Sequence, residues 1–141
     1  ENDPAPDSAE SEVEESIEAS LSLERDLHSY LAKAFHEIEN GLILLPDGIE
    51  HQIDAGRVDI LARDRSGQLV VIELKAGIAK DAALGQLLGY IGCIAETSSG
   101  KPVRGILIAS DFDKRVVYAA KALPQIKLIK YKVAFQLQEI T

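Results

Sequence analysis

The chain has 141 residues, 46% of them hydrophobic, and a formal net charge of −8. This length accommodates one domain with a core of ordinary size. No run of about 18 apolar residues is present, which excludes a transmembrane helix, and the chain does not begin with the basic-then-apolar pattern of a secretory signal. Because the single Cys93 cannot form an internal disulfide, we expect a cytoplasmic protein. The chain contains no Met, so we expect a fragment, a processed form or the ordered part of a longer protein.

The negative charge is concentrated at the start of the chain. Residues 1–18 carry eight acidic side chains and no basic ones, which leaves 15 acidic side chains against 15 Lys and Arg in the remainder. Together with Pro4 and Pro6, this composition predicts a disordered tail or linker over residues 1–19. A DNA-mimicking arm that competes for a basic surface is the functional alternative. We expect residues 20–141 to form one neutral folded domain.

The remaining elements are predicted from periodicity and turn signals. Apolar residues at helical spacing from Leu23 to Ile38 predict a helix over about 20–39. Turn signals at Pro46-Asp47-Gly48 and within residues 64–67 separate short strands. The expected strands are 42–45, 50–53, 57–63 and 69–75, followed by a helix over 81–97, a buried strand over 103–109, a helix over 113–123 and one long or two short strands over 126–137.

This order predicts an α/β fold in which helices cover both faces of a mixed sheet. Gly85, Gly89 and Gly92 fall on one side of the second helix. We expect this smooth side to pack closely against the sheet.

Charged side chains interrupt the most apolar strands of the chain. Glu73 and Lys75 follow Leu69-Val70-Val71-Ile72, and Asp59 lies within Val58-Asp59-Ile60-Leu61. Strand alternation places Glu73 and Lys75 on one face, and pairing of the two strands would bring Asp59 near Glu73. Two carboxylates about 4 Å apart repel by roughly 4 kcal/mol at an effective dielectric near 20. A buried carboxylate must be paired, protonated or bound to a metal, so the pattern predicts a metal site.

Hard oxygen ligands of this kind suit Mg²⁺. We expect Asp59, Glu73 and the backbone carbonyl of Leu74 to bind the metal. Lys75 would then hold or deprotonate an attacking water and contact a phosphate. The alternative is a structural ion pair between Glu73 and Lys75. The strand-end position and the upstream Asp59 favour the metal site.

Three motifs resemble those of the PD-(D/E)XK nuclease superfamily. They are Gly56-Arg57-Val58-Asp59, Val71-Ile72-Glu73-Leu74-Lys75 and Gln86-Leu87-Leu88-Gly89-Tyr90. More narrowly, residues 23–137 are similar to the catalytic domain of NucS/EndoMS-type endonucleases. The resemblance implies a restriction-endonuclease-like fold, with an αβββαβ core plus a further helix and strand. It also implies a Mg²⁺- or Mn²⁺-dependent DNA endonuclease that acts in DNA repair or on mismatched or branched DNA.

The resemblance assigns roles to individual residues. The implied catalytic set combines the metal ligands, a lysine and accessory polar residues: Asp59, Glu73, Lys75, Glu24, Gln86 and Tyr90. Without the resemblance, Tyr90 reads as a core aromatic residue and Gln86 as a solvated one. Glu24 reads as an acid in the first helical turn, favoured there by the helix dipole.

Nucleic-acid contacts are expected from Gln52, Arg57, Lys130 and Lys132. Gln52 is carried over from the family and Arg57 lies in its Gly-Arg-Val-Asp motif, whereas alternation places Lys130 and Lys132 on one face of the last strand. The two lysines are equally interpreted as a solvated edge that prevents sheet aggregation. His28 lies one helical turn after Glu24 and can approach the site, although a surface or packing role is the simpler interpretation.

The chain departs from the family at two points. Gly89 stands where relatives often carry Arg. The N-terminal domain of the NucS/EndoMS type, which contributes to dimerisation and DNA binding, has no counterpart in these residues. We therefore expect DNA as the partner, with either a homodimer or a larger parent chain. The alternatives are a catalytically inactive nuclease-fold module that binds nucleic acid or a protein partner, and a structural domain in which the charged cluster is accidental.

Overall fold

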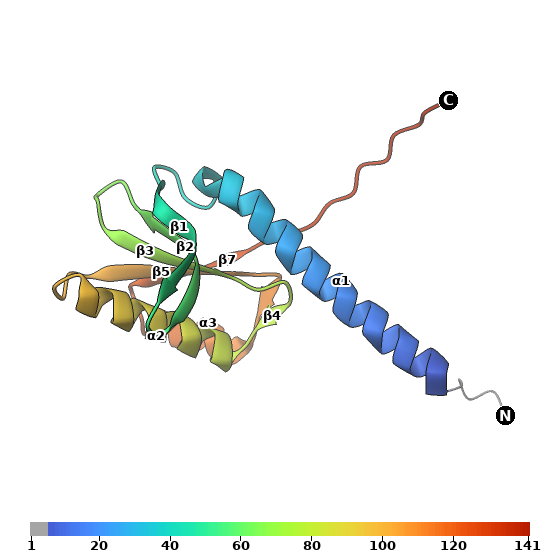
Figure 1. The fold of residues 1–141 in the computed structure, drawn as a ribbon, viewed down its shortest axis with the longest axis horizontal. Coiled ribbons are helices and arrows are strands. Elements are labelled where there is room, and N and C mark those ends of the chain that lie inside the picture. Colours follow the sequence, from blue (N-terminus) through green and yellow to red (C-terminus); the bar gives the residue numbers. More distant parts are fainter. Residues whose placement is uncertain (1–5) are drawn as a thin grey trace.

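A five-stranded mixed sheet runs through the computed structural model, which describes residues 6–141 (Figure 1). Its strands, in the order in which they pair, are β1 (Ile43–Ile53), β2 (Gly56–Arg63), β3 (Leu69–Leu74), β5 (Val103–Ala109) and β7 (Ile126–Lys130). The first three strands form an antiparallel meander, and β3, β5 and β7 are parallel. The central strands β3 and β5 are almost wholly buried, as expected for strands covered on both faces.

Helices cover both faces of this sheet, which confirms the predicted layers. The helices α2 (Asp81–Thr97) and α3 (Lys114–Lys121) lie on one face, where Leu87 and Val116 are completely buried. The helix α1 (Pro6–Lys33) and the 3₁₀ helix η1 (Phe35–Glu37) lie on the other face (Figure 1). The predicted bounds of α2 and β5 agree with the structure. In residues 6–141, no helix is long and apolar enough to cross a membrane.

A second, two-stranded sheet was not predicted. It pairs β4 (Ile78–Ala79) with β6 (Asp111–Phe112) in parallel, directly after β3 and β5. Strands of two residues are too short to leave a periodic signal in the sequence.

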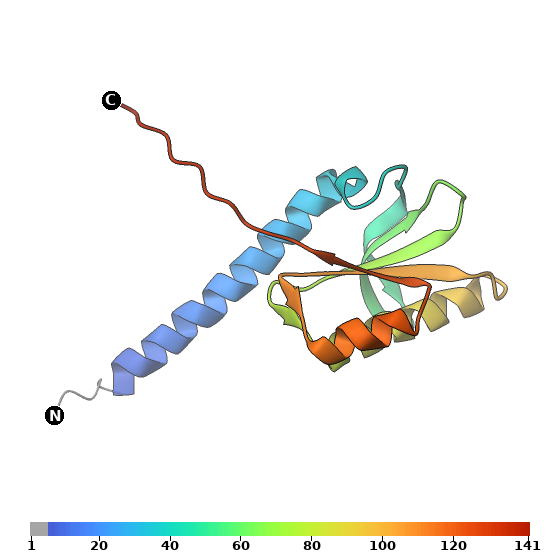
Figure 2. The ribbon, with the colours of Figure 1, turned by 180° about the vertical axis from the view of Figure 1, so that it is seen from behind.

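The first helix begins much earlier than expected. It starts at Pro6 and ends at Lys33, whereas the sequence predicted about 20–39 and a disordered tail or linker before it. Residues 6–19 are therefore helical and not disordered, a linker role for them stays a prediction, and residues 1–5 lie outside the described part of the chain. Pro is well tolerated at the first helical position, and acidic residues near a helix N-terminus are stabilising. The N-terminal half of α1 extends beyond the sheet (Figures 1 and 2).

The last strand is shorter than expected. It ends at Lys130, and residues 131–141 leave the sheet without regular structure (Figure 2). Alternation of polar and apolar residues indicates an extended chain but cannot show that a partner strand exists. The placement of Lys130 and Lys132 on one strand face is therefore wrong, since Lys132 lies beyond the strand.

The glycines of α2 face solvent, which corrects the expected close packing on the sheet. A Cβ atom added at Gly85, Gly89 or Gly92 would have no neighbour within 4 Å. The close contact is made instead by Gly105 in β5, where an added Cβ would lie 2.5 Å from Ile91 Cδ1. The apolar side of α2 carries the larger residues, and the glycines lie on its exposed side.

Candidate active site

Two carboxylates meet where the pairing of β2 and β3 ends. The last paired residues are Ile60 and Ile72, and Asp59 and Glu73 come next on their strands. The Asp59 N–H donates to Glu73 Oε2 at 2.7 Å, and the Leu74 N–H donates to Asp59 Oδ2 at 2.9 Å. Each carboxylate is thus held by the backbone of the other strand. The predicted approach of Asp59 to Glu73 is confirmed.

Burial makes this carboxylate pair unfavourable to ionise. Glu73 is 5% exposed and is the only polar or charged residue among the described ones that counts as buried. Burial, followed by the negative charge of Asp59, raises the pKa of Glu73 from 4.5 to about 8. Burial also raises the pKa of Asp59, an effect opposed by the hydrogen bond from Leu74 and by His28. The site therefore favours either a shared proton or a positive charge.

The other predicted catalytic residues surround this pair. A pocket of about 380 Å³ is lined by Glu24, Glu50, Arg57, Asp59, Glu73, Leu74, Lys75, Gln86 and Tyr90. The structure thus brings Glu24 from α1, and Gln86 and Tyr90 from α2, to the ends of β2 and β3. The Lys75 N–H donates to the carbonyl of Ile108 at 2.8 Å, which fixes the backbone of Lys75 against β5.

Tyr90 approaches the site through a gap left by a glycine. Gly56, the first residue of the Gly-Arg-Val-Asp motif, has a φ of 140°, and an added Cβ would lie 2.9 Å from the Tyr90 hydroxyl. Only glycine leaves this space and readily adopts this φ. Burial, followed by the charges of Glu73 and Asp59, raises the pKa of Tyr90.

Three of the expected nucleic-acid contacts lie outside this pocket. Gln52 is exposed, and its side-chain amide donates to the carbonyls of Ile53 and Gly56, which stabilises the turn between β1 and β2. Lys130 lies 3.8 Å from Asp111. Lys132 lines a separate apolar groove beside α1. Arg57 does line the pocket, and its guanidinium lies 3.8 Å from Glu50.

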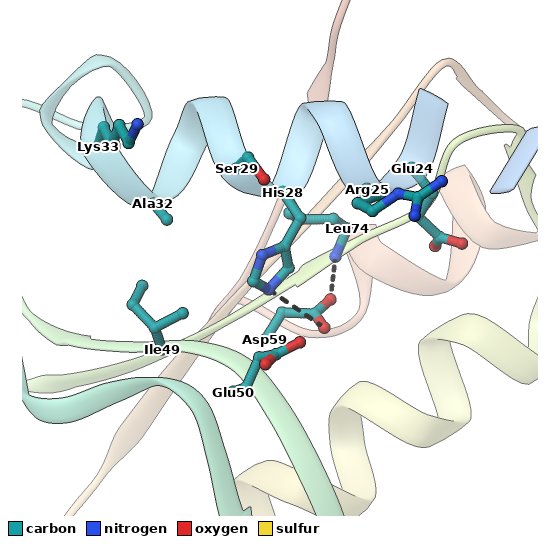
Figure 3. Close-up of a pocket in the computed structure, with 10 residues that line it drawn as sticks. All are labelled: Glu24, Arg25, His28, Ser29, Ala32, Lys33, Ile49, Glu50, Asp59 and Leu74. Atoms are coloured by element: carbon teal, nitrogen blue, oxygen red, sulfur yellow. Dashed lines mark hydrogen bonds and ion pairs between the residues drawn. The ribbon is translucent and has the colours of Figure 1, made fainter. Parts of the chain in front are cut away.

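Two residues at the site were missed or undervalued from the sequence. Glu50 reaches the pocket because β1 is irregular between Leu44 and Ile49 and because Glu50 itself has a φ of 51°. No sequence pattern signals this geometry. His28 Nε2 lies 3.9 Å from Asp59 Oδ1 and has no hydrogen-bond partner in the described part of the chain (Figure 3). The spacing of four residues from Glu24 was the available signal.

A larger hollow adjoins the carboxylates along α1. It has a volume of about 590 Å³ and shares Glu24, Glu50, Asp59 and Leu74 with the smaller pocket. Its remaining lining comes from α1 and β1: Arg25, His28, Ser29, Ala32, Lys33 and Ile49 (Figure 3). The carboxylate pair is therefore open to a molecule larger than an ion.

The donor atoms at the site fit a hard divalent cation only in part. Within residues 6–141, no group of three or more His, Cys, Asp or Glu side chains is arranged to hold an ion. Mg²⁺, however, usually keeps several waters and takes one or two carboxylates from the protein. Asp59 and Glu73, with the carbonyl of Leu74, match that smaller set. Their mutual repulsion is what a bound cation would relieve.

The fold and site define a mixed α/β domain in which a buried and a half-buried carboxylate, with a lysine beside them, meet where the pairing of two adjacent strands ends. The chain belongs to the Endonuclease NucS C-terminal domain family, whose model matches residues 23–131.

Relatives and solved structures agree with this assignment. Endonuclease NucS of Methanopyrus kandleri is 33% identical over 102 residues, covering 72% of this chain and 38% of the relative. Endonuclease NucS of Thermococcus kodakarensis is 45% identical over 60 residues, 43% of this chain and 23% of the relative. The crystal structure of a repair endonuclease from Pyrococcus abyssi has a TM-score of 0.66 at 26% identity, covering 82% of this chain and 46% of that one. A structure of an EndoMS–dsDNA complex has a TM-score of 0.63 at 27% identity, covering 84% and 46%. The chain spans less than half the length of these proteins.

Proposed function

We propose that this chain is the catalytic domain of a metal-dependent DNA endonuclease of the PD-(D/E)XK type, with a restriction-endonuclease-like fold. The observation that carries the proposal is the cross-bonded pair of Asp59 and Glu73 with Lys75 beside it in one pocket. Relatives named endonucleases support the same chemistry. The alternative of an inactive nuclease-fold module gains no support from the site, because all six candidate catalytic residues line the same pocket.

The metal would be Mg²⁺ or Mn²⁺, held by Asp59, Glu73 and the carbonyl of Leu74. When bound, such an ion supplies an activated water and stabilises charge on the phosphate and on the leaving oxygen. The protein's part is to keep the two carboxylates together. The backbone N–H groups of Asp59 and Leu74 do this, because the Asp59 and Glu73 side chains cannot rotate apart without losing these hydrogen bonds.

The remaining residues would orient the reacting groups. The Lys75 ammonium would hold the attacking water and contact the phosphate to be cleaved, because it shares the pocket with both carboxylates. Gln86 and the Tyr90 hydroxyl would form the side of the pocket that belongs to α2. Glu24 would hold water on the opposite side, from α1.

The substrate would be DNA, with repair or processing of mismatched or branched DNA as the setting. One structural relative is described as a complex with double-stranded DNA, and Arg57 lines the pocket where a phosphate would enter. Gln52, Lys130 and Lys132 would contact DNA only at a distance from the cleavage point. We further propose a cytoplasmic protein that acts as a homodimer or within a larger parent chain with an N-terminal domain.

Incubation with labelled mismatched, branched and single-stranded DNA tests this function. We expect cleavage that requires Mg²⁺ or Mn²⁺, stops with EDTA and is lost in Glu73→Gln. The matched control is Glu96→Gln, which removes an exposed carboxylate from α2 and should cut as the wild type does. Equal cleavage by the wild type and Glu73→Gln would show that the activity comes from a contaminant.

A further inference from the structure

The helix α1 presents two neighbouring rows of polar side chains to the site. Residues three or four positions apart lie on the same side of a helix. Glu24 and His28 form one row, which faces the carboxylates, and His28 reaches Asp59. Arg25, Ser29 and Lys33 form the next row and line the larger hollow. The second row has no part in the proposed bond cleavage.

The hollow under this second row is long and chemically mixed. Arg25 and Lys33 lie at opposite ends of the helix face that covers it, with His28 and Asp59 between them (Figure 3). Eight residues of α-helix separate the two cations, a distance of about 12 Å along the axis. Ala32 and Ile49 give the hollow an apolar lining on the side of Lys33.

The two cations are available to an external anion. Arg25 and Lys33 are both exposed, and neither forms an ion pair with a side chain of residues 22–141. The acidic lining of the hollow comes from Glu24 and Glu50, which also line the catalytic pocket, where a divalent cation would offset their charge. Arg25 lies beside Glu24 at one end of the hollow, and Lys33 lies at the other end (Figure 3).

We propose that the face of α1 formed by Arg25, Ser29 and Lys33 binds the sugar–phosphate backbone of a DNA strand. Arg25 and Lys33 contact phosphates on either side of the one that reaches Asp59. Successive phosphates of a strand are separated by at least the axial rise of about 3.4 Å per nucleotide, so a span of about 12 Å is long enough for the two cations to contact different phosphates. Two separated cations above a partly apolar lining suit a polyanionic strand better than a single free phosphate.

This inference rests on the proposed nuclease function and adds the path of the strand to it. The contacts are to phosphates, so they position the substrate and do not read its sequence. Arg25 and Lys33 are therefore positioning residues, and their loss should weaken DNA binding equally for all sequences.

The test compares two double substitutions that remove the same charge. The rim variant, Arg25→Gln with Lys33→Gln, loses the two α1 cations that border the hollow. The control variant, Lys101→Gln with Lys121→Gln, loses two exposed lysines that precede β5 and β7, at the end of the sheet away from Asp59. Both are made in the Glu73→Gln background, and binding of a fluorescent DNA oligonucleotide is measured over a range of salt. We expect the rim variant to bind at least about tenfold more weakly and to lower the slope of log K against log salt by about 1.4 to 1.8, from two lost phosphate contacts.

Neutral methylphosphonate groups, placed in turn around the mapped cleavage position, make the test local. At two positions in the DNA strand, the neutral group should weaken binding by the protein that keeps Arg25 and Lys33. At the same two positions it should have no further effect on binding by the rim variant. Equal affinity and salt slope for the two double variants would overturn the inference while leaving a DNA-cutting chain intact. A chain that neither binds nor cuts DNA would overturn the proposed function and this inference together.

Discussion

Replacing Glu73 with Gln should remove a loss of stability that the wild type shows between about pH 4.5 and 8 in metal-free solution. The pKa of Glu73 is raised in the folded chain from 4.5 to about 8. Between these values, the folded chain retains a proton that the unfolded chain has released. The contribution of Glu73 to the free energy of unfolding is therefore complete below about pH 4.5 and is lost as the pH rises to about 8.

The size of the effect follows from the same values. Each pKa unit corresponds to about 1.4 kcal/mol, so the rise from 4.5 to about 8 sets a ceiling of about 5 kcal/mol on the stability lost. The steepest slope is about 1.4 kcal/mol per pH unit. Glu73→Gln keeps the side-chain volume and cannot ionise, so its curve should lack this loss of stability between about pH 4.5 and 8.

Urea unfolding in EDTA at several pH values measures both curves, and the difference between them reports the contribution of Glu73. Adding Mg²⁺ or Mn²⁺ at about pH 8 should restore stability to the wild type and leave Glu73→Gln unchanged, because a ligand that binds only the folded state stabilises it. A wild-type curve that runs parallel to that of Glu73→Gln would refute the buried-carboxylate argument. Glu96→Gln, which changes an exposed side chain, should follow the wild type.

Two further substitutions test the support of the site. Gly56→Ala should lower the free energy of unfolding by about 1–3 kcal/mol and abolish cleavage, because the new Cβ would lie 2.9 Å from the Tyr90 hydroxyl. The control is Gly67→Ala, which has a φ of 88° and no neighbour within 4 Å, so it introduces backbone strain without a contact. Equal effects of the two substitutions would disprove the role of the Tyr90 contact. Glu39→Gln should lower the free energy of unfolding by about 1–2 kcal/mol, since it removes the negative charge and one of the two acceptor oxygens that bond Arg104 at 2.7 to 3.3 Å, while Asp64 stays 3.4 Å from the Arg104 guanidinium. Thermal or urea unfolding checks this value, and a change below about 0.5 kcal/mol would place the pair with ordinary surface ion pairs.

The elements predicted well from the sequence are those whose signals are local. The helix α2 lies between Gly77 and a Ser-Gly segment and has apolar residues at helical spacing, so both its ends could be placed. The strand β5 is a continuous apolar run because it is buried on both faces. The errors arise where structure depends on a partner. Residues 131–137 alternate as a strand does, yet β7 is the last strand of the sheet and the chain leaves it.

The candidate site was predictable to the extent that it is built into the sheet. The carboxylates Asp59 and Glu73 are conspicuous because they interrupt apolar strands, and the strand pairing that joins them follows from a short turn. Glu50 could not be found in this way, because its position depends on an irregular strand and a left-handed backbone conformation. The contact of His28 with Asp59 depends on how α1 crosses the sheet, which helical spacing alone does not determine.

The crossed hydrogen bonds between Asp59, Glu73 and Leu74 also couple the chemistry to correct folding. Side chains alternate along a strand, so a slip of β2 against β3 by a single residue turns one carboxylate to the opposite face of the sheet. In the proposed nuclease the cleavage centre would then be lost, although most of the hydrophobic core could still collapse. A mispaired chain would not cut DNA. The capacity to cut would arise only once β2 and β3 have paired in the native register, so that cleavage would depend on correct folding.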